Sequence, residues 1–422
     1  MTRTGSAQGA SRVGALAVVV SAGASPFLAQ TLAGITSQTC PPDVVLVVDV
    51  ASRANGLGDG TPIEELVESS GLDTVSAVRV VRVKEAKTFG DAVSRGLAAY
   101  AELVAAGNRR RRGAGAVDGV DGVDGTDGSD TDGSSSGSRT SVRDLLLTGS
   151  GPITGPTGAL SPITPYEQQL VAPVPAQPEA PEHQVWFWLL HDDSAPQEDC
   201  LEKLLTAVTN ARSVGIVGPK QVGWDNPELL LEVGLRATAS ARRANDIVPG
   251  EVDQGQHDDR SDVLAVGTAG ALIDRAVWEE IGGIAPWLGP FGDGLELSRA
   301  ARLAGYRVIV EPTAVIRHRR ASYQGLRRPA HASRSAARTD ADAIEVQLPE
   351  PDPERSFRAR RSAQLTNWAA FSSRPIGLLL TWFVILGTMR AVWRLASKAP
   401  ALARDELGAA LAVAGRGRRI KA

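Results

Sequence analysis

An acidic doublet directly follows an apolar segment in the middle of the chain. Residues 185–190 read VWFWLL, and His191, Asp192 and Asp193 come next. In α/β proteins the carboxyl ends of buried parallel strands open into the crevice that binds ligands. Adjacent carboxylates repel one another there unless a cation neutralises them, and Mg²⁺ or Mn²⁺ binds such carboxylates together with substrate phosphate oxygens. The doublet therefore predicts a nucleotide-diphosphate site with a divalent cation, and its alternative role is a helix N-cap.

A series of small, acidic and aromatic residues follows later in the chain. Residues 267–275 read GTAGALIDR, and a Gly-Gly pair stands at 282–283. Residues 293–297 read DGLEL, and residues 305–308 read GYRV. The glycine pair is typical of a helix C-cap, where the backbone turns left-handed. The order of these segments is more specific than any one of them.

Hydrophobic periodicity predicts the elements that position these residues. In residues 12 to about 107, strands are expected at 14–20, 44–48 and 78–83, because these are continuous apolar or β-branched runs. A helix is expected over 26–38, where the apolar residues have helical spacing. Strand, helix and strand at this spacing indicate right-handed βαβ units. The fold class predicted is α/β, with a mainly parallel sheet flanked by helices.

The same pattern resumes from Gln184 to about Tyr323. After the strand that precedes the doublet, the sequence predicts a helix over about 199–210 and a strand at 214–217. Further helices are expected from about Asp274 to the glycine pair and over about 295–304, followed by a strand at 306–310.

Between these halves, residues 108 to about 182 have the composition of a disordered insertion. Four arginines at 109–112 lead into Asp-Gly repeats, and the segment then becomes rich in serine and proline. Such a segment cannot bury enough apolar surface to offset the loss of chain entropy. Aspartates punctuated by glycine also suggest a calcium loop, but their spacing is irregular and no glutamate closes a twelve-residue loop.

The ordered series resembles the family 2 glycosyltransferases of the GT-A fold, of the bacterial membrane-associated type. In that family a strand ends in a DxD-type motif, and a small-residue strand running into an arginine follows. A Gly-Gly turn, an acidic pair at the head of a helix, Ala-Gly-Tyr-Arg-Val and a histidine then come in order. The resemblance covers residues 12–107 and 184–323, including VVD at 47–49 and TFGDAVSRG at 88–96. The expected catalytic domain is therefore residues 12–323, interrupted at about 108–182.

The resemblance implies a role for each matching residue. Asp193 would be the principal metal ligand, and His318 would contact the metal or the diphosphate, since a neutral imidazole can bind a divalent ion. An exposed basic strand end is the alternative for His318, which lies between two arginines. The nucleotide contacts would be Asp49, Gly90, Asp91 and Asp192.

Asp293 is the expected general base, because an inverting transfer needs one carboxylate to accept the proton of the acceptor hydroxyl. The family commonly has two adjacent acids here and a third two residues later, whereas this chain has Gly294. Glu296 is therefore the alternative base, and a helix N-cap is the alternative role of Asp293. His191 is a second departure, since many members have the first acid of the DxD motif at that position.

Trp287 lies shortly before the expected base and is a candidate acceptor platform, because aromatic faces pack against the C–H surface of sugars. Core packing explains this tryptophan equally well. Phe291 is open to the same two interpretations.

The carboxyl-terminal part has a different character. A polar linker is expected over 324–362, followed by a membrane-associated helix and basic tail over 363–422. The apolar run at 375–389 is about 15 residues long, short of the roughly 20 that span a bilayer, but it reaches that length if it continues to Leu395. Tryptophans at 382 and 393 suit a membrane interface, and a soluble packing helix is the alternative.

Composition limits the other classes of function. The formal net charge of the 422 residues is −3, which gives no electrostatic reason to expect nucleic-acid binding. Two cysteines exclude a disulfide scaffold and a four-cysteine zinc site. The first apolar run lacks a signal-peptide cleavage pattern. We therefore expect the cytoplasmic face of the cell membrane, and the apolar segment near the end allows the chain to be the front part of a larger membrane protein.

The function expected is a metal-dependent inverting glycosyltransferase. It would use Mn²⁺ or Mg²⁺ to move a sugar from a nucleotide-diphosphate donor to a hydroxyl of a lipid-linked or cell-envelope glycan. A catalytically silent binding or scaffold module is the main alternative, favoured by Gly294 and His191. A nucleotidyltransferase is less favoured, because residues 21–25 (SAGAS) contain no basic residue to grip a triphosphate.

Overall fold

A nine-stranded sheet forms the centre of the molecule. The structure is a computed structural model, and it describes residues 13–51, 62–114, 184–209, 211–244, 246–327 and 350–420. Eight of the strands follow the order β3-β2-β1-β4-β10-β6-β11-β5, and β7 pairs with β6. The strands are β1 (Gly14–Ser21), β2 (Val44–Asp49), β3 (Ala77–Arg82), β4 (Val185–His191), β5 (Ser194–Pro196), β6 (Val214–Gly223), β7 (Leu230–Glu232), β10 (Leu272–Asp274) and β11 (Arg307–His318).

The long strands of this sheet all run in one direction. β1 is parallel to both β2 and β4, and β2 is parallel to β3. β10 is antiparallel to both β4 and β6, so β6 points the same way as β4, and β11 is parallel to β6. The predicted α/β fold with a mainly parallel sheet is confirmed.

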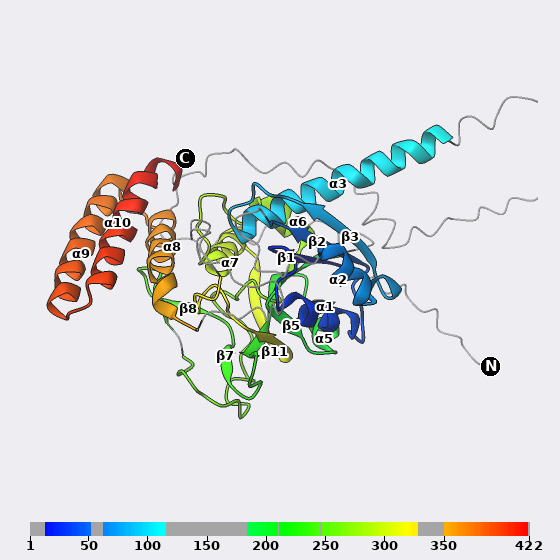
Figure 1. Cartoon of the computed structure of the whole chain (residues 1–422), viewed down its shortest axis with the longest axis horizontal. Helices are drawn as coiled ribbons and strands as arrows, with labels where there is room; N and C mark the ends of the chain where they lie inside the picture. Colours follow the sequence, from blue (N-terminus) through cyan, green and yellow to red (C-terminus); the bar gives the residue numbers. More distant parts are fainter. Residues whose placement is uncertain are drawn as a thin grey trace, which may run out of the picture.

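Helices cover both faces of the sheet (Figure 1). Along β1 the side chains alternate, so that Ala15, Ala17 and Val19 belong to one apolar cluster while Leu16 and Val18 belong to the other. The first cluster includes residues of α1 (Leu28–Thr36), α2 (Ile63–Ser69) and α5 (Cys200–Thr209). The second includes residues of α3 (Phe89–Ala114), α6 (Arg275–Ile281) and α7 (Asp293–Leu303).

Shorter elements complete this domain. They are a 3-10 turn, η1 (Leu72–Thr74), and a two-stranded ribbon of β8 (Arg236–Ala237) and β9 (Arg243–Ala244). The glycine pair ends α6 as predicted, since Gly282 has a left-handed φ of 73° and follows Ile281 directly. At the other end of α6 the side chain of Asp274 accepts a hydrogen bond from the Ala276 backbone N–H and caps the helix.

The predicted insertion lies mostly outside the described residues. Residues 108–114 are the exception, because they continue α3 as helix instead of beginning the insertion. Residues 350–362 also differ from the predicted linker, since they include η4 (Pro353–Ser356) and the first part of α8 (Phe357–Ala370).

Three helices at the carboxyl end form a layered stack (Figure 1). α10 (Pro400–Ile420) packs against both α8 and α9 (Ile376–Ala396). Their shared apolar cluster includes Leu365 of α8, Phe383 of α9 and Val413 of α10. The predicted apolar helix is confirmed, and it is longer than the apolar run because it continues through two arginines to Ala396. By length and composition, α9 could cross a membrane.

Candidate active site

The site lies where the strand order reverses, at the carboxyl edge of the sheet. β1 has β2 on one side and β4 on the other, although β4 comes more than a hundred residues later in the chain. Such switch points leave a crevice between the strand ends, where open α/β sheets bind ligands. Ser21 ends β1 and His191 ends β4, and the Ser21 hydroxyl donates to Asp192 Oδ2 over 3.3 Å. The acid doublet therefore stands in this crevice, as predicted.

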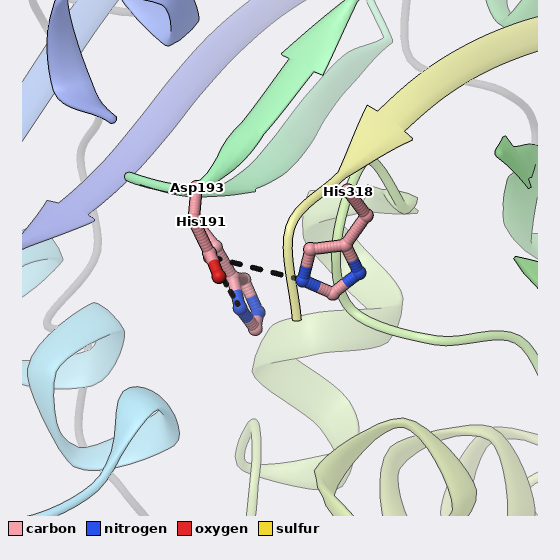
Figure 2. A group of neighbouring side chains, drawn as sticks. All are labelled: His191, Asp193 and His318. Atoms are coloured by element: carbon pink, nitrogen blue, oxygen red, sulfur yellow. Dashed lines mark ion pairs between the residues drawn. The ribbon is translucent and has the colours of Figure 1, made fainter. Parts of the chain in front are cut away.

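Three side chains converge there: His191, Asp193 and His318 (Figure 2). His318 Nε2 lies 3.7 Å from Asp193 Oδ1, and His191 Nδ1 lies 4.0 Å from the same oxygen. One potential ligand atom from each residue lies within 4.8 Å of the others. β11 brings His318 to the doublet, because His318 pairs with Ser194 of β5 immediately after Asp193. We call these three residues the trio.

The two carboxylate oxygens of Asp193 have different surroundings. Oδ2 accepts a hydrogen bond of 2.7 Å from the backbone N–H of Ala321. Oδ1 is buried and accepts no hydrogen bond. Burial alone would raise the pKa of Asp193, but Arg327, His318 and His191 outweigh burial and hold that pKa below its usual range. A buried carboxylate oxygen without a donor is costly unless a cation completes its surroundings.

Hydrogen bonds fix the tautomer of His318. Gln221 donates its Nε2–H to the Ala269 carbonyl, so its Oε1 is the acceptor that faces His318 Nδ1 at 3.0 Å. Nδ1 must then carry the proton, which leaves the lone pair on Nε2, the atom nearer Asp193 Oδ1. Burial lowers the pKa of His318 and keeps the ring neutral.

A similar chain of hydrogen bonds fixes His191. The Thr268 hydroxyl donates to Asp293 Oδ2 over 3.2 Å, so it accepts from His191 Nε2 at 3.0 Å. The lone pair of His191 is then on Nδ1, again toward Asp193. The ring of Phe89 packs against this imidazole with its centroid 4.2 Å away.

Two imidazole lone pairs and one carboxylate oxygen without a hydrogen bond thus face a common point. This donor set fits a divalent cation, because all three groups present an electron pair to the same point. Mg²⁺ prefers oxygen ligands, so two imidazole nitrogens favour a transition-metal ion over Mg²⁺.

Asp192 makes the closer contact with Arg327. Its carboxylate pairs with the guanidinium of Arg327, whose Nη1 lies 3.2 Å from Oδ2 while Nη2 pairs with Oδ1. The same Nη2 lies 3.3 Å from Asp193 Oδ1. Burial would lower the pKa of Arg327, but the two carboxylates outweigh burial and raise it. Arg327 was not predicted as a site residue, because it lies in the expected linker and nothing in its local sequence marks it.

The trio lines a cavity of about 620 Å³. That volume suits a ligand the size of a nucleotide sugar. Nine basic and five acidic side chains line it, so the lining has an excess of positive charge. One wall comes from α8 through Phe357, Arg360, Arg361, Ala363, Gln364 and Asn367.

Asp293 begins α7 and lines this cavity. Through Thr268 its carboxylate is connected to His191, a member of the trio. Gly294 follows, and a Cβ atom there would lie 2.3 Å from the Val266 carbonyl oxygen. The missing second acid therefore has a steric cause, which is the close approach of α7 to this backbone.

Glu296 is buried and points elsewhere. It accepts a hydrogen bond of 3.2 Å from the Ala285 backbone N–H, and it is not among the described residues that line the cavity. Burial, together with nearby Asp293, raises the pKa of Glu296 to about 7 despite that hydrogen bond. Its surroundings give it a structural role, so the geometry favours Asp293 over Glu296 as the base.

Asp49, Gly90 and Asp91 are the other predicted nucleotide contacts, and the structure uses them in local packing. Asp49 ends β2, and its Oδ1 accepts from the backbone N–H groups of Gly23 and Ala51 at 3.0 and 2.8 Å. Asp91 accepts from Lys87 N–H and pairs with Arg95 on α3.

Gly90 is needed for packing, because a Cβ atom there would lie 2.5 Å from Ile284. None of these three side chains is among the described residues lining the cavity, although neighbouring Val50, Thr88 and Phe89 are.

Trp287 is half-buried and packs against the larger core cluster, which is the alternative considered for it. Phe291 lines the cavity instead. Of the two aromatic residues considered for an acceptor platform, only Phe291 is thus placed in the cavity wall, and its contact with an acceptor stays a prediction.

Residues 168–338 match the model of a family described as "Glycosyltransferase like family 2". The match spans β4, β11 and all three residues of the trio. Residues 168–338 are therefore similar to glycosyltransferase family 2. This similarity agrees with the predicted family resemblance over the matched segment. A search of curated proteins found no match.

Several solved structures are similar at low identity. The mannosyltransferase PcManGT from Pyrobaculum calidifontis, in complex with GDP-Man and Mn²⁺, is 17% identical, with 94% of this chain and 86% of that chain covered and a TM-score of 0.38. GalNAc-T7 with UDP, GalNAc and Mn²⁺ is 14% identical over 72% of this chain and 43% of that one, with a TM-score of 0.40. TarS from S. aureus is 10% identical over 74% and 37%, with a TM-score of 0.37. The chain thus spans less than half the length of the last two, and likenesses this weak carry no argument about its function.

Proposed function

We propose that the protein is a metal-dependent glycosyltransferase that uses a nucleotide-diphosphate sugar. The observation that carries this proposal is the trio, in which two imidazole lone pairs and a carboxylate oxygen that accepts no hydrogen bond converge at the switch point of the sheet. The family 2 match of the surrounding segment and the excess of basic side chains in the cavity support it.

His191, Asp193 and His318 would hold Mn²⁺. Bound there, the ion would stabilise the negative charge that develops on the departing diphosphate. The positive cavity lining would bind the rest of the diphosphate and keep it in place.

Asp293 would accept the proton of the acceptor hydroxyl. That oxygen would form its bond to the anomeric carbon as the bond from this carbon to the diphosphate breaks, which inverts the configuration. The hydrogen bond from Thr268 to Asp293 Oδ2 would orient the carboxylate for this step. Phe291 lines the same cavity and could pack against the acceptor sugar.

A membrane-proximal acceptor is part of the proposal. α9 has an uncharged outward stripe that includes Leu378, Trp382, Ile385 and Met389, all exposed. Arg394 lies on the opposite side, with its guanidinium 5.6 Å from the Phe357 ring of α8. An apolar helix face of this kind binds the interface of a bilayer, which would bring a lipid-linked or cell-envelope glycan to the enzyme at the cytoplasmic face of the membrane.

The test compares metal binding with catalysis in two variants. Asp193→Asn is expected to weaken Mn²⁺ binding by about tenfold or more, because it removes the only anionic ligand of the trio. Asp293→Asn is expected to bind Mn²⁺ and the nucleoside diphosphate normally but to lose about 10²-fold or more of donor turnover. Electron paramagnetic resonance of Mn²⁺ and release of nucleoside diphosphate from donor sugars measure the two effects.

Asp73→Asn, at an exposed position, is the control. Binding of Mn²⁺ and nucleotide with no turnover toward any donor or acceptor would favour a silent binding module instead. Failure of the natural protein to bind Mn²⁺ would contradict the proposal.

A further inference from the structure

Arg327 contacts the two acids of the doublet unequally, because Nη1 and Nη2 both pair with Asp192 whereas only Nη2 lies near Asp193 Oδ1, at 3.3 Å. Asp192 is 1% exposed, and both of its carboxylate oxygens face the guanidinium of Arg327. Oδ2 also accepts from the Ser21 hydroxyl at 3.3 Å, and the Asp192 carbonyl accepts from Thr31 Oγ1 at 2.8 Å. No oxygen of Asp192 is left without a hydrogen bond.

Asp193 shows the opposite arrangement. Its Oδ1 is the carboxylate oxygen of the doublet that accepts no hydrogen bond, and it is the one that faces both imidazoles. A cation could bind Oδ1 at the cost of at most the single 3.3 Å contact with Arg327 Nη2. Binding to Asp192 would instead require the loss of the two-point contact with Arg327, and this contact is costly to lose because it is mostly buried.

Packing of the preceding chain fixes the place of Arg327. Leu326 is fully buried and forms a small apolar cluster with Phe27 and Ala321. Ala321 in turn donates its backbone N–H to Asp193. The segment that leads to Arg327 is therefore attached to the doublet through Ala321 and to a small apolar cluster through Leu326.

Arg327 has more donors than these carboxylates use. A guanidinium has five N–H groups in a planar fork, four of them on Nη1 and Nη2, whereas Nε of Arg327 is buried without a hydrogen-bond partner. The side chain is about a quarter exposed and lines the cavity beside the trio. The guanidinium is thus fixed on its carboxylate side and open toward the cavity.

We propose that the doublet is divided between two cations, so that Asp193 binds the metal ion while Asp192 positions Arg327 to bind the diphosphate of the donor. This inference rests on the proposed function and deepens it. Asp192 would then be a positioning residue, and Arg327 a further contact of the leaving group beside the metal ion.

A charge-balanced pair of substitutions tests this division. The double variant Asp192→Asn, Arg327→Gln removes one negative and one positive charge, so the local net charge is unchanged. We expect its Mn²⁺ dissociation constant to stay within about threefold of the natural value, whereas Asp193→Asn raises it about tenfold or more. We expect its dissociation constant for UDP and GDP, measured calorimetrically at saturating Mn²⁺, to rise about tenfold or more.

Two single variants complete the series. Arg327→Gln is expected to weaken nucleoside diphosphate binding as much as the double variant does, because the two residues act as one unit. Arg327→Lys keeps the charge but not the planar fork and should be intermediate. The pair Arg275→Gln, Glu279→Gln removes a comparable salt bridge on α6, away from the cavity, and should change neither constant. Thermal melting of each variant checks that it is folded.

The possible results distinguish a failure of this inference from a failure of the proposed function. If the double variant loses Mn²⁺ binding as Asp193→Asn does, Asp192 is a metal ligand and the division is wrong, while the proposed function stands. If Arg327→Gln leaves nucleoside diphosphate affinity unchanged, Arg327 is only a counter-ion and the inference is equally wrong. If the natural protein binds neither Mn²⁺ nor a nucleoside diphosphate, both the inference and the proposed function are wrong.

Discussion

Single hydrogen bonds decide what the side chains of the cavity can do. Gln221 and Thr268 each fix which nitrogen of a histidine carries the proton, and both direct the imidazole lone pair toward Asp193. Asp193 itself differs from Asp192 only in its contacts, since the two residues are adjacent and of one type. For single residues, the chemical role of a side chain thus depends on which of its atoms already have hydrogen-bond partners.

Glu296 is expected to make stability depend on pH. Its pKa is about 7 in the folded protein, against 4.5 as the ordinary value, so between those pH values the folded state binds a proton that the unfolded chain releases. The contribution of Glu296 to the free energy of unfolding is fully present below about pH 4.5 and is lost as pH rises through about 7. Glu296→Gln removes this loss, and the variant should gain about 3 kcal/mol relative to the natural protein between pH 5 and pH 8.

Urea denaturation at several pH values measures this gain, and the same variant should keep its donor turnover because Glu296 does not line the cavity. If the free energy of unfolding changes with pH in the same way in both proteins, or if the variant loses donor turnover, this account of Glu296 is wrong.

The family resemblance implied that Asp193 and His318 share a site, although the strand predicted at 306–310 ends before His318 and only the structure extends β11 to that residue. Arg327 and Gln221 could not be predicted in the same way. Their partners lie 135 and 97 residues away in the chain, and no local pattern specifies such contacts. Trp287 was ambiguous for a related reason, since an aromatic residue near a site has the same local sequence whether it faces the cavity or the core.

The helices and strands around the cavity are placed by close backbone contacts as well as by apolar faces. α7 lies near enough to the segment before β10 that only a glycine fits at position 294. This contact fixes the start of α7 and, with it, the position of Asp293. The order of elements was predictable from periodicity, whereas this closeness was not, because it depends on how two elements pack.

Gly294→Ala is therefore expected to destabilise the protein. Its Cβ atom would lie 2.3 Å from one backbone atom, which cannot move as a side chain does. The free energy of unfolding should fall by about 2 kcal/mol or more, as for other overpacked sites. Gly289→Ala is the matched control, because no atom lies within 4 Å of the position that its Cβ would take. Chemical denaturation compares the two, and equal stabilities would contradict the steric explanation of the missing acid.

At the scale of the whole molecule, the carboxyl-terminal helices connect the cavity to an apolar surface. α8 closes one wall of the cavity, where Asn367 donates to the Gly292 carbonyl over 3.3 Å. α10 holds α8 through the buried pair of Arg361 and Glu406, and α9 forms the outer layer (Figure 1). The surface proposed to meet the membrane is thus the outer side of α9, whose inner side contacts α8 through Arg394 and Phe357.

Vesicle flotation tests that surface. Ile385 is 47% exposed on α9, and Ile385→Glu should abolish or strongly reduce binding to anionic vesicles, because a charge would enter the hydrocarbon boundary. Leu103 is 53% exposed on α3, so Leu103→Glu is the matched control and should float as the natural protein does. A natural protein that does not float but forms a defined dimer, which Ile385→Glu separates, would show that the stripe is a protein interface instead.

The position of α8 also limits how the protein can be shortened. Removal of the apolar carboxyl-terminal helices is an obvious way to try to make the protein more soluble. A chain that ends before residue 350 would keep the trio but would lose α8, which forms one wall of the cavity. Loss of activity in such a protein would therefore not test the roles of the trio. A chain that ends between α8 and α9 would expose the apolar side chains of Leu365 and Ala369 and would therefore tend to aggregate. Replacement of exposed apolar residues of α9 with polar residues is a better way to obtain a soluble protein.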